Sequence, residues 1–423
     1  MPITSRELAS QLALGDGAGP ETNGMQPRST RASPLHVLEV FQPETGGVPR
    51  YVANLARGLL RDGWPVTVAG PPRALESSEL QELGVEILPI AVRRAPHPLQ
   101  DLATVRQIAR WCRERDVSVI HGHSTKASLL AALAGRRAGI PSVYTPHGWA
   151  FERLDRPALR ASYALFEREM AHRYHAAVIT VSSSGRAAAE RWRVTPKGRI
   201  RVVPTGLSPT PVVSKATARR RLGLRPEEYV AVWVGRTGDQ KRPQDLAPIA
   251  RGLRGSTTVL ALCDQLQGSA LGDELEAAGV LVLDSEMDPE IAYGAADVLL
   301  HTSSWEACPL VVLEAMWASR PVVAYDVGGL SEQVQAGRTG YLVAQGDVGM
   351  MCECIRALAR RPELREAMGE AAHQRVAKLF AYSSMLEGIR DTYTSVAGGR
   401  PVLEQGFDAR RRKPVMDIAD VAG

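Results

Sequence analysis

The stretch DVLLHTSSWEACPLVVLEAM, residues 297–316, decides the fold of this chain. Its first five residues have the apolar content of a buried strand, and the residues after Pro309 have that of a buried helix. Proline suits the first position of a helix, so we expect the helix to begin at Pro309. A strand, a polar loop and a helix form the repeating unit of parallel α/β sheets, which predicts the architecture of the rest of the chain.

Two glutamates, Glu306 and Glu314, lie eight positions apart in this stretch. Glu314 is the only ionisable residue between Pro309 and Ser319, and a buried carboxylate needs hydrogen-bond donors around it. Residues 306–308 precede the helix, where unpaired backbone N–H groups and the helix dipole attract phosphate. The stretch therefore predicts an anion site flanked by two acceptors for hydroxyl groups. The alternative is structural, with Glu314 pairing to a buried arginine in a core helix.

The same alternation of strand and helix runs through most of the chain and breaks at residues 202–211, where Pro, Thr, Ser and Gly predict a linker. Before the break we expect strands at 35–40, 65–70, 85–90, 117–122, 142–145 and 177–181, and helices at 49–63, 99–115, 126–138 and 157–174. After it we expect strands at 230–234, 257–262, 280–283, 297–301 and 321–325, helices at 243–253 and 271–278, and a mostly helical segment at 348–396. The pattern predicts an α/β protein with two doubly wound, Rossmann-like halves that face each other across a cleft.

The length of 423 residues exceeds what one compact core supports, so we expect two domains with tails. The predicted parts are a disordered leader at 1–33, an N-terminal domain at 34–205, a C-terminal domain at 206–379 and a flexible tail at 398–423. A helix at about 380–397 completes the N-terminal domain.

Composition narrows the class of protein. With 44% hydrophobic and 23% charged residues, the chain resembles an ordinary globular protein. Its five cysteines lack the paired spacing of a disulfide framework or a zinc site. It has neither an apolar run long enough to span a membrane nor a signal peptide near Met1, which predicts a cytoplasmic protein. A net charge of +5 favours an anionic partner, but aromatic residues are too few, at 5%, to favour nucleic acid.

Glycines and cations follow the first strand of each half. Gly46 and Gly47 precede the first helix, where a backbone can approach a diphosphate or sugar closely, although a plain tight turn explains them equally well. Gly235, Arg236 and Lys241 follow the equivalent strand of the second half. The arginine fork and the lysine charge can converge on a pyrophosphate; the alternative is two solvated cations in a loop.

Histidines follow two strands of the first half. His123 precedes Ser124, and His147 lies two residues before Trp149. Because the carboxyl ends of parallel strands share one edge, we expect these residues to face the same cleft, although a lone histidine is more often a structural hydrogen-bonding residue. Ser182 has the plainer interpretation of a helix N-cap. Gly328, Gly329 and Glu332 predict a further loop beside the opening stretch.

The helix expected near residues 102–115 is amphipathic. Val105, Ile108 and Cys112 lie on one side and three arginines on the other. A helix that covers a sheet and exposes a basic face explains this pattern better than a helix lying on a membrane surface.

Together these motifs resemble the retaining GT-B glycosyltransferases of family 4, also called glycosyl transferases group 1. The resemblance extends from about residue 35 to residue 396. It depends most on the E-x7-E stretch from Glu306 to Glu314 and on the order of the other motifs: Gly46-Gly47-Val48, Pro146-His147-Gly148, Val203-Pro204-Thr205-Gly206, Val234-Gly235-Arg236 with Lys241, and Gly328-Gly329 with Glu332.

The resemblance implies a nucleoside diphosphate sugar donor, UDP- or GDP-linked, bound mainly by the second domain. It implies a glycan, lipid-linked or small-molecule acceptor bound mainly by the first, with His123, Ser124 and Trp149 on the acceptor side. Arg236 and Lys241 would neutralise the diphosphate, Glu306 would contact the sugar and Glu314 the ribose. Backbone groups of Gly46, Gly47, Gly235, Cys308, Pro309 and Leu310 would complete the donor site, with His147 against the transferred sugar. No metal is expected. A lipid-linked acceptor would also imply a peripheral contact between the protein and the membrane.

The chain departs from the family pattern at Thr205, which stands where asparagine is common, and at Ala307 and Cys308, where glycine and an apolar residue are common. Two alternatives to a transferase are considered. One is a nucleotide-sugar epimerase, which would need acid and base carboxylates in the cleft, whereas the loops of the first domain supply histidines and serines. The other is a non-catalytic protein that binds sugar nucleotides, since a fold does not prove turnover.

Overall fold

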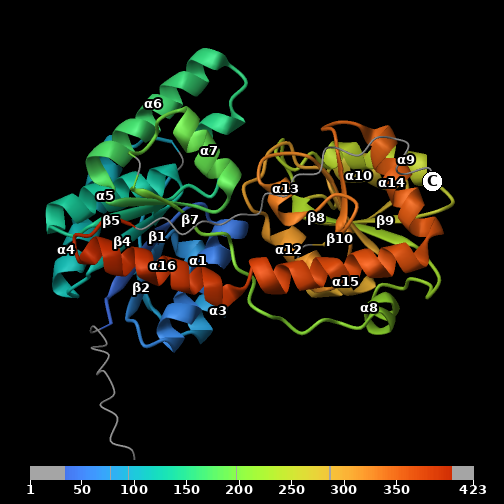
Figure 1. Cartoon of the computed structure of the whole chain (residues 1–423), viewed down its shortest axis with the longest axis horizontal. Helices are drawn as coiled ribbons and strands as arrows, with labels where there is room; N and C mark the ends of the chain where they lie inside the picture. Colours follow the sequence, from blue (N-terminus) through green and yellow to red (C-terminus); the bar gives the residue numbers. More distant parts are fainter. Residues whose placement is uncertain (1–33, 77, 94, 197, 285–286, 403–423) are drawn as a thin grey trace, which may run out of the picture. The chain divides into compact units, whose positions relative to one another are not determined.

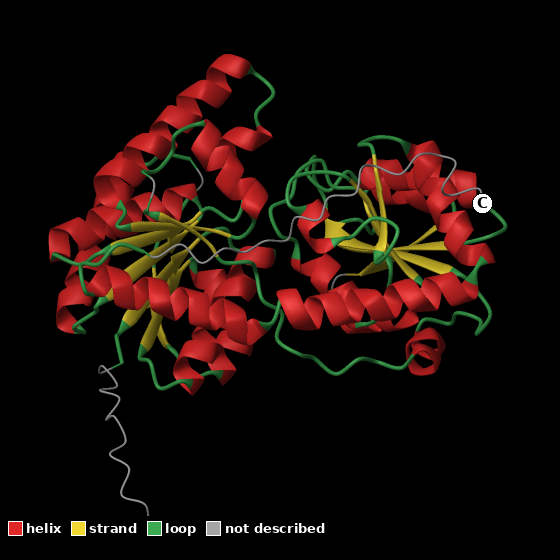
Figure 2. Cartoon of the chain, in the orientation of Figure 1, coloured by secondary structure: helices red, strands yellow, loops and turns green. Residues whose placement is uncertain are grey.

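The computed structural model describes residues 34–402 apart from 77, 94, 197 and 285–286. The predicted leader at 1–33 lies outside the described residues, as does nearly all of the predicted tail. Within the described part, strands and helices alternate as two successive α/β halves, each with helices on both faces of a sheet (Figure 2). The residues that separate the two halves lie between β7 and α8, at positions 203–214.

The first half contains a sheet of seven strands in the order β3-β2-β1-β4-β5-β6-β7. All its neighbouring strands are parallel. Its elements are β1 (Val37–Phe41), α1 (Gly47–Arg61), β2 (Val66–Gly70), α2 (Pro72–Leu75), α3 (Ser78–Glu82), β3 (Glu86–Pro89), α4 (Pro98–Glu114), β4 (Val119–His123), α5 (Thr125–Ala138), β5 (Ser142–Thr145), η1 (Ala150–Arg153), α6 (Pro157–Tyr174), β6 (Ala177–Thr180), α7 (Ser183–Arg191) and β7 (Ile200–Val202).

The second half contains a sheet of six parallel strands in the order β10-β9-β8-β11-β12-β13. Its elements are α8 (Lys215–Arg221), β8 (Val230–Arg236), η2 (Pro243–Asp245), α9 (Leu246–Leu253), β9 (Thr258–Asp264), α10 (Ala270–Ala277), β10 (Val280–Asp284), α11 (Pro289–Ala295), β11 (Val298–His301), α12 (Leu310–Trp317), β12 (Val322–Tyr325), α13 (Leu330–Gln333), β13 (Gly340–Val343), α14 (Val348–Arg360) and α15 (Pro362–Leu379).

The last helix of the described residues is α16 (Tyr382–Ala397), which returns to the first half (Figure 1). Met385, Leu386 and Ile389 of this helix are buried in the same apolar cluster as α1 and the first sheet. The return passes beside the linker, because Leu207 N donates to the carbonyl of Phe380 at 2.9 Å. A Cβ on Gly206 would lie 2.8 Å from the Cα of Tyr382, so only glycine allows the two connections to approach this closely.

The α/β fold class is confirmed, and most predicted elements fall within a few residues of those observed. Two strands were not predicted. β7 has only three residues and overlaps the segment interpreted as linker, and β13 follows a turn rather than a helix. Helices α8 and α11 were also missed, because seven residues are too few for a helical period to stand out. Pro309 corrects one boundary, since its ψ of 128° places it just before α12.

Candidate functional site

The second half brings Lys241 and Glu306 together at the carboxyl edge of its sheet. Lys241 Nζ donates to Glu306 Oε1 at 2.6 Å, and both side chains are largely buried. Burial alone would raise the pKa of Glu306, but Lys241 and the neighbouring His301 outweigh it and hold that pKa well below its usual range. His301, which the sequence interpretation missed, ends β11 with its Nε2 atom 3.4 Å from Glu306. Glu306 is therefore a fixed carboxylate beside a cation that has two further N–H donors.

The loop that holds Glu306 is fixed by the glycine pair that follows β12. Gly329 N donates to the Glu306 carbonyl at 3.0 Å. A Cβ on Gly328 or Gly329 would lie 1.9 Å from the carbonyl oxygen of Glu306 or Ala307, respectively. Side chains at these two positions would push the loop away, so the glycines are needed where they stand.

Cys308 is also held in place within this loop. Burial raises the pKa of its thiol to about 12, and Thr205 lies within hydrogen-bonding reach of it. Gln333 Nε2 lies 3.3 Å from the sulfur on another side. A thiol with so high a pKa is not a nucleophile near neutral pH, so Cys308 shapes the loop. Thr205 and Cys308, two of the three departures from the family pattern, therefore contact each other.

Glu314 lies on α12 and has partners from two elements. Arg50 Nη2 of α1 donates to its Oε1 at 2.6 Å, and Tyr293 of α11 donates to its Oε2 at 2.8 Å. The arginine is 45% exposed and comes from the first half, so it is not the buried core arginine of the structural alternative. Each carboxylate oxygen has a second lone pair, so Glu314 can still accept a hydroxyl hydrogen. Neither Arg50 nor Tyr293 was predicted.

Arg236 lies against the glycine loop of the first half. Gly46 has a φ of +100°, and a Cβ there would lie 3.0 Å from Cζ of Arg236. Gly46 thus provides both the left-handed turn before α1 and room for the guanidinium. Gly47 begins α1 with no neighbour in the path of a side chain. Packing explains why residue 235 is a glycine, because a Cβ added there would lie 2.8 Å from the indole of Trp233.

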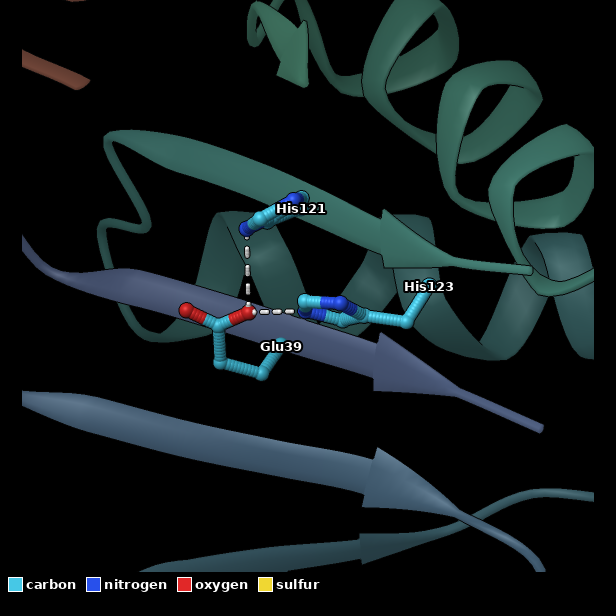
Figure 3. A group of neighbouring side chains, drawn as sticks. All are labelled: Glu39, His121 and His123. Carbon is cyan, nitrogen blue, oxygen red and sulfur yellow. Dashed lines mark hydrogen bonds and ion pairs between the residues drawn. The ribbon is translucent and has the colours of Figure 1, made fainter. Parts of the chain in front are cut away.

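His123 and His147 belong to one buried hydrogen-bonded group with Glu39. His121 and His123 project from the same face of β4, and Glu39 projects beside them from β1 (Figure 3). Glu39 Oε2 lies 2.7 Å from His123 Nε2, and His123 Nδ1 lies 2.9 Å from His147 Nε2. Burial raises the pKa of Glu39, but the two histidines outweigh it and lower that pKa to about 2.

Glu39, His121 and His123 are also the described residues best arranged to hold a metal ion, since their ligand atoms lie within 4.8 Å of one another. Two histidines and a carboxylate would suit zinc. However, the same atoms have other partners: Tyr393 OH lies 2.7 Å from Glu39 Oε1 and 2.6 Å from His121 Nδ1. The arrangement therefore fits a hydrogen-bonded network without a metal.

The structure corrects the prediction for Trp149. Its side chain is buried in the core, where it stacks on Phe151 and donates to the carbonyl of Gly185. A buried indole with a satisfied N–H does not contact an acceptor. Ser124 has a positive φ of +75° and lies at the N-cap position just before α5, beside His123.

Ser182 caps α7 as predicted, because its side chain accepts from Gly185 N. Glu332, from the glycine loop beside the opening stretch, contacts the start of the same helix. Its carboxylate accepts from Ser183 N at 2.8 Å and Ser184 N at 2.7 Å, so an acid of the second half caps a helix of the first.

These features agree with comparisons to known proteins. A model of the glycosyl transferase 4-like domain matches residues 46–206, and a model of glycosyl transferases group 1 matches residues 214–375. The D-inositol 3-phosphate glycosyltransferase of Geodermatophilus obscurus is 30% identical over 418 residues, which cover 88% of this chain and 90% of the relative. This chain belongs to the group 1 glycosyltransferases.

Other members of the family extend the comparison. A UDP-Gal:alpha-D-GlcNAc-diphosphoundecaprenol alpha-1,3-galactosyltransferase of Escherichia coli is 24% identical over 312 residues, covering 70% of this chain and 80% of the relative. Among solved structures, Anabaena HepE in complex with UDP and glucose gives a TM-score of 0.75 at 20% identity, covering 85% of this glycosyltransferase and 100% of HepE. WaaG, a glycosyltransferase involved in lipopolysaccharide biosynthesis, gives 0.66 at 18% identity, covering 85% and 100%. These likenesses confirm the GT-B fold.

Proposed function

We propose that this glycosyltransferase moves a sugar, with retention of its anomeric configuration, from a nucleoside diphosphate sugar to an acceptor hydroxyl. The contact between Lys241 and Glu306 carries the proposal, because a cation able to meet phosphate charge lies beside a carboxylate able to accept from sugar hydroxyls, just before α12. In this proposal, residues 206–379 form the donor domain, and residues 34–205 with the helix at about 380–397 form the acceptor domain.

The chemistry follows from the charges. Arg236 and Lys241 stabilise the diphosphate as it departs, and the N–H groups of Gly47, Cys308 and Leu310 add donors of hydrogen bonds. Glu306 orients the sugar and Glu314 accepts from the ribose. The bond from the acceptor oxygen to the anomeric carbon forms on the face from which the diphosphate leaves, and the acceptor proton passes to the departing phosphate oxygen. Pro309, which has no N–H, contributes only its conformation.

A panel of nucleotide sugars tests the donor by thermal shift, because a ligand that binds only the native state stabilises it by about 2.7 kcal/mol at 100 times its Kd. UDP-linked sugars are expected to raise the Tm most, since HepE was solved with UDP and glucose. GDP-mannose is the matched comparison. A chain that no nucleotide sugar stabilises would contradict the proposed donor class.

The configuration of the product tests retention. With the donor identified, proton NMR of the glycoside product reads the coupling constant of its anomeric proton. Retention predicts that an α-linked donor gives an α-linked product. A β-linked product would overturn the same-face reaction but would leave the donor site as proposed.

We further propose that the acceptor is carried on a lipid and that α6 contacts the membrane surface. No helix of the described residues is long and apolar enough to cross a membrane. Helix α6, however, exposes four large apolar side chains, Leu159, Tyr163, Leu165 and Phe166, by 42–62%. Arg156, Arg168 and Arg173 are exposed at the start of the same helix or within it, which favours anionic lipid. On α4, Val105, Ile108 and Cys112 are buried in the core of the first half, which supports the sheet-covering interpretation, while Leu99 and Leu102 near the start of that helix are exposed.

Sedimentation with vesicles tests this surface. The protein is expected to sediment with phosphatidylglycerol vesicles more than with phosphatidylcholine vesicles. The double variant Leu165→Asp/Phe166→Asp should lose most of that binding, whereas Val212→Asp, at an exposed apolar position outside α6, should not. Equal sedimentation of the two variants would contradict the proposed contact.

A further inference from the structure

A line of hydrogen bonds connects a buried carboxylate to the histidine that the proposed function places beside the sugar. Glu39 and His123 are fully buried, whereas His147 is only partly buried and follows β5 with a left-handed φ of +54°. The distances are 2.7 Å from Glu39 Oε2 to His123 Nε2 and 2.9 Å from His123 Nδ1 to His147 Nε2. Both are ordinary hydrogen-bond lengths, so each link needs one proton and one lone pair.

The positions of these protons follow from the carboxylate. An ionised Glu39 only accepts, so His123 must carry its proton on Nε2. A neutral His123 then has a lone pair on Nδ1, and His147 must donate from Nε2. A neutral His147 is left with a lone pair on Nδ1. This arrangement of protons satisfies both hydrogen bonds of the line and leaves Nδ1 of His147 as an open acceptor.

Burial supports the neutral forms. It lowers the pKa of His147 well below its usual range and lowers that of His123 to about 4, with the neighbouring His121 acting in the same direction. Glu39 opposes both shifts but does not overcome them.

The loop of His147 lies next to the loop that carries Glu306. A Cβ on Gly148 would lie 3.9 Å from the Cβ of Ala307. Tyr51 packs against His147 edge to face, with their rings 4.6 Å apart, which restricts how the imidazole can turn. The ring is thus held both by its hydrogen bond and by packing, at a place where two candidate substrate loops meet.

We propose that Glu39 and His123 are positioning residues that hold His147 as a neutral imidazole with its proton on Nε2, so that Nδ1 accepts a hydrogen bond from a substrate hydroxyl. The inference rests on the proposed function for the presence of substrate beside His147. It assigns His147 the role of an acceptor rather than that of a cation or an acid, so the same ring would favour a sugar hydroxyl over a phosphate oxygen.

Nitrogen NMR of protein labelled with 15N-histidine tests the arrangement without any substrate, because the two ring nitrogens of a neutral histidine differ in chemical shift. The variant His147→Gln identifies the His147 signals by their loss. At pH 7 we expect a protonated Nε2 and a bare Nδ1. A proton on Nδ1, a charged ring, or metal bound to His123 in stoichiometric amount would overturn the proposal.

The variant Glu39→Gln tests the function of the line. Glutamine has the shape of glutamate, but its amide can donate to His123 and so reverse both hydrogen bonds. We expect a second His147 tautomer in the spectrum and a fall in kcat/KM of about tenfold, with the thermal shift by UDP unchanged. An unchanged tautomer would contradict the inference. If the variant does not fold, the spectrum of the unaltered protein still decides the matter.

His175→Gln is the matched control. His175 is another buried histidine of the first half, bound to Ser128 and Ser142 rather than to Glu39. Its replacement should lower the Tm without changing the His147 signals or kcat/KM. If it lowers kcat/KM as much as Glu39→Gln does, the effect is one of general stability and the positioning role is wrong. A failure of the proposed transferase activity would remove the kinetic result but not the tautomer.

Discussion

The two halves share one order of six parallel strands, to which the first half adds β7, but they place different chemistry at their strand ends. In the second half, Glu306 is paired with an ammonium and Glu314 with a guanidinium. In the first half, Glu39 is surrounded by imidazole and phenol groups at zero exposure. Formal charges suit a diphosphate whose charge must be met as it leaves, whereas neutral donors and acceptors suit uncharged hydroxyls. Although the two halves share a fold, the groups that contact each buried carboxylate differ, and we infer that these groups determine what each half binds.

The first half provides its own contrast in Glu167, on α6. This carboxyl is also fully buried, but the described hydrogen bonds it accepts come from hydroxyls, those of Thr125 and Tyr144. Burial raises its pKa to about 7, whereas the pKa of Glu39 falls to about 2. The pKa values of two equally buried glutamates thus shift in opposite directions, since Glu39 has two histidines beside it and Glu167 has hydroxyl groups.

The largest effect on stability is expected from Asp297→Ala. This variant tests an ion-paired carboxylate that we expect to stabilise the fold without contacting the substrate. Asp297 pairs with Lys215 at 2.5 Å and Arg219 at 2.7 Å and accepts from Val230 N. Its removal leaves a buried arginine without its partner, so we expect a loss of about 3–5 kcal/mol in the free energy of unfolding. Donor affinity of the folded fraction should not change. Urea unfolding measures the free energy of unfolding, and isothermal titration measures donor affinity. A large change in donor affinity would show that Asp297 affects the donor site as well as the fold.

Lys241→Ala tests charge that serves the reaction. Loss of one preorganised donor to a leaving group lowers kcat by roughly 10²–10³, and here the variant also leaves Glu306 without its cation. Initial rates with a donor known to bind measure the effect, and Lys241→Arg keeps the charge as a control. If the alanine variant reacts at nearly the rate of the unaltered protein, Lys241 does not stabilise the departing diphosphate.

Glu167→Gln tests the buried carboxyl whose described hydrogen bonds come from hydroxyl groups. Because the folded pKa of about 7 exceeds the ordinary 4.5, the folded protein holds an extra proton between these values, and stability falls as the pH rises from about 4.5 to about 7. Glutamine removes this loss, so the variant should gain at most about 3 kcal/mol relative to the unaltered protein at pH 8 and little at pH 4. Unfolding midpoints at the two pH values provide the comparison. A gain that does not depend on pH would show that Glu167 is not protonated.

Glu314→Ala tests the ribose contact. A hydrogen bond to a charged group contributes about 1.5–3 kcal/mol, so donor affinity should fall by roughly 10- to 100-fold and transfer should be lost at ordinary donor concentrations. Isothermal titration with the nucleoside diphosphate measures the change. Glu314→Gln should keep part of the affinity, and an alanine variant that binds normally would exclude the contact.

Arg50→Ala should have the smallest effect. Although its contact with Glu314 is only 2.6 Å long, the arginine is 45% exposed, and such pairs contribute about 0–1 kcal/mol. Thermal unfolding at low and high salt measures the change. A loss well above 1 kcal/mol in the free energy of unfolding would show that Arg50, like Asp297, forms an ion pair that stabilises the fold.

The sequence was sufficient for the alternation of strands and helices and for the loops at strand ends, because hydrophobic period and glycine position are local signals. It could not identify partners that are distant in sequence. Arg50 meets Glu314 across 264 positions, and Tyr393 meets Glu39 across 354. Glu39 itself was detectable, since it is the one ionisable residue within the apolar strand β1, by the reasoning that selected Glu314. The prediction that Trp149 lies on the acceptor side was not reliable, because a position shortly after a strand does not determine whether a side chain points into the cleft or into the core.

The return of α16 to the first half has a consequence for synthesis on the ribosome. Tyr393, Leu386 and Ile389 belong to the core of the first half, whose strands β1 to β7 are made long before them. That core cannot be completed until almost the whole chain has emerged, whereas the described core of the second half needs nothing beyond Phe380. The half that is translated last can therefore finish folding first.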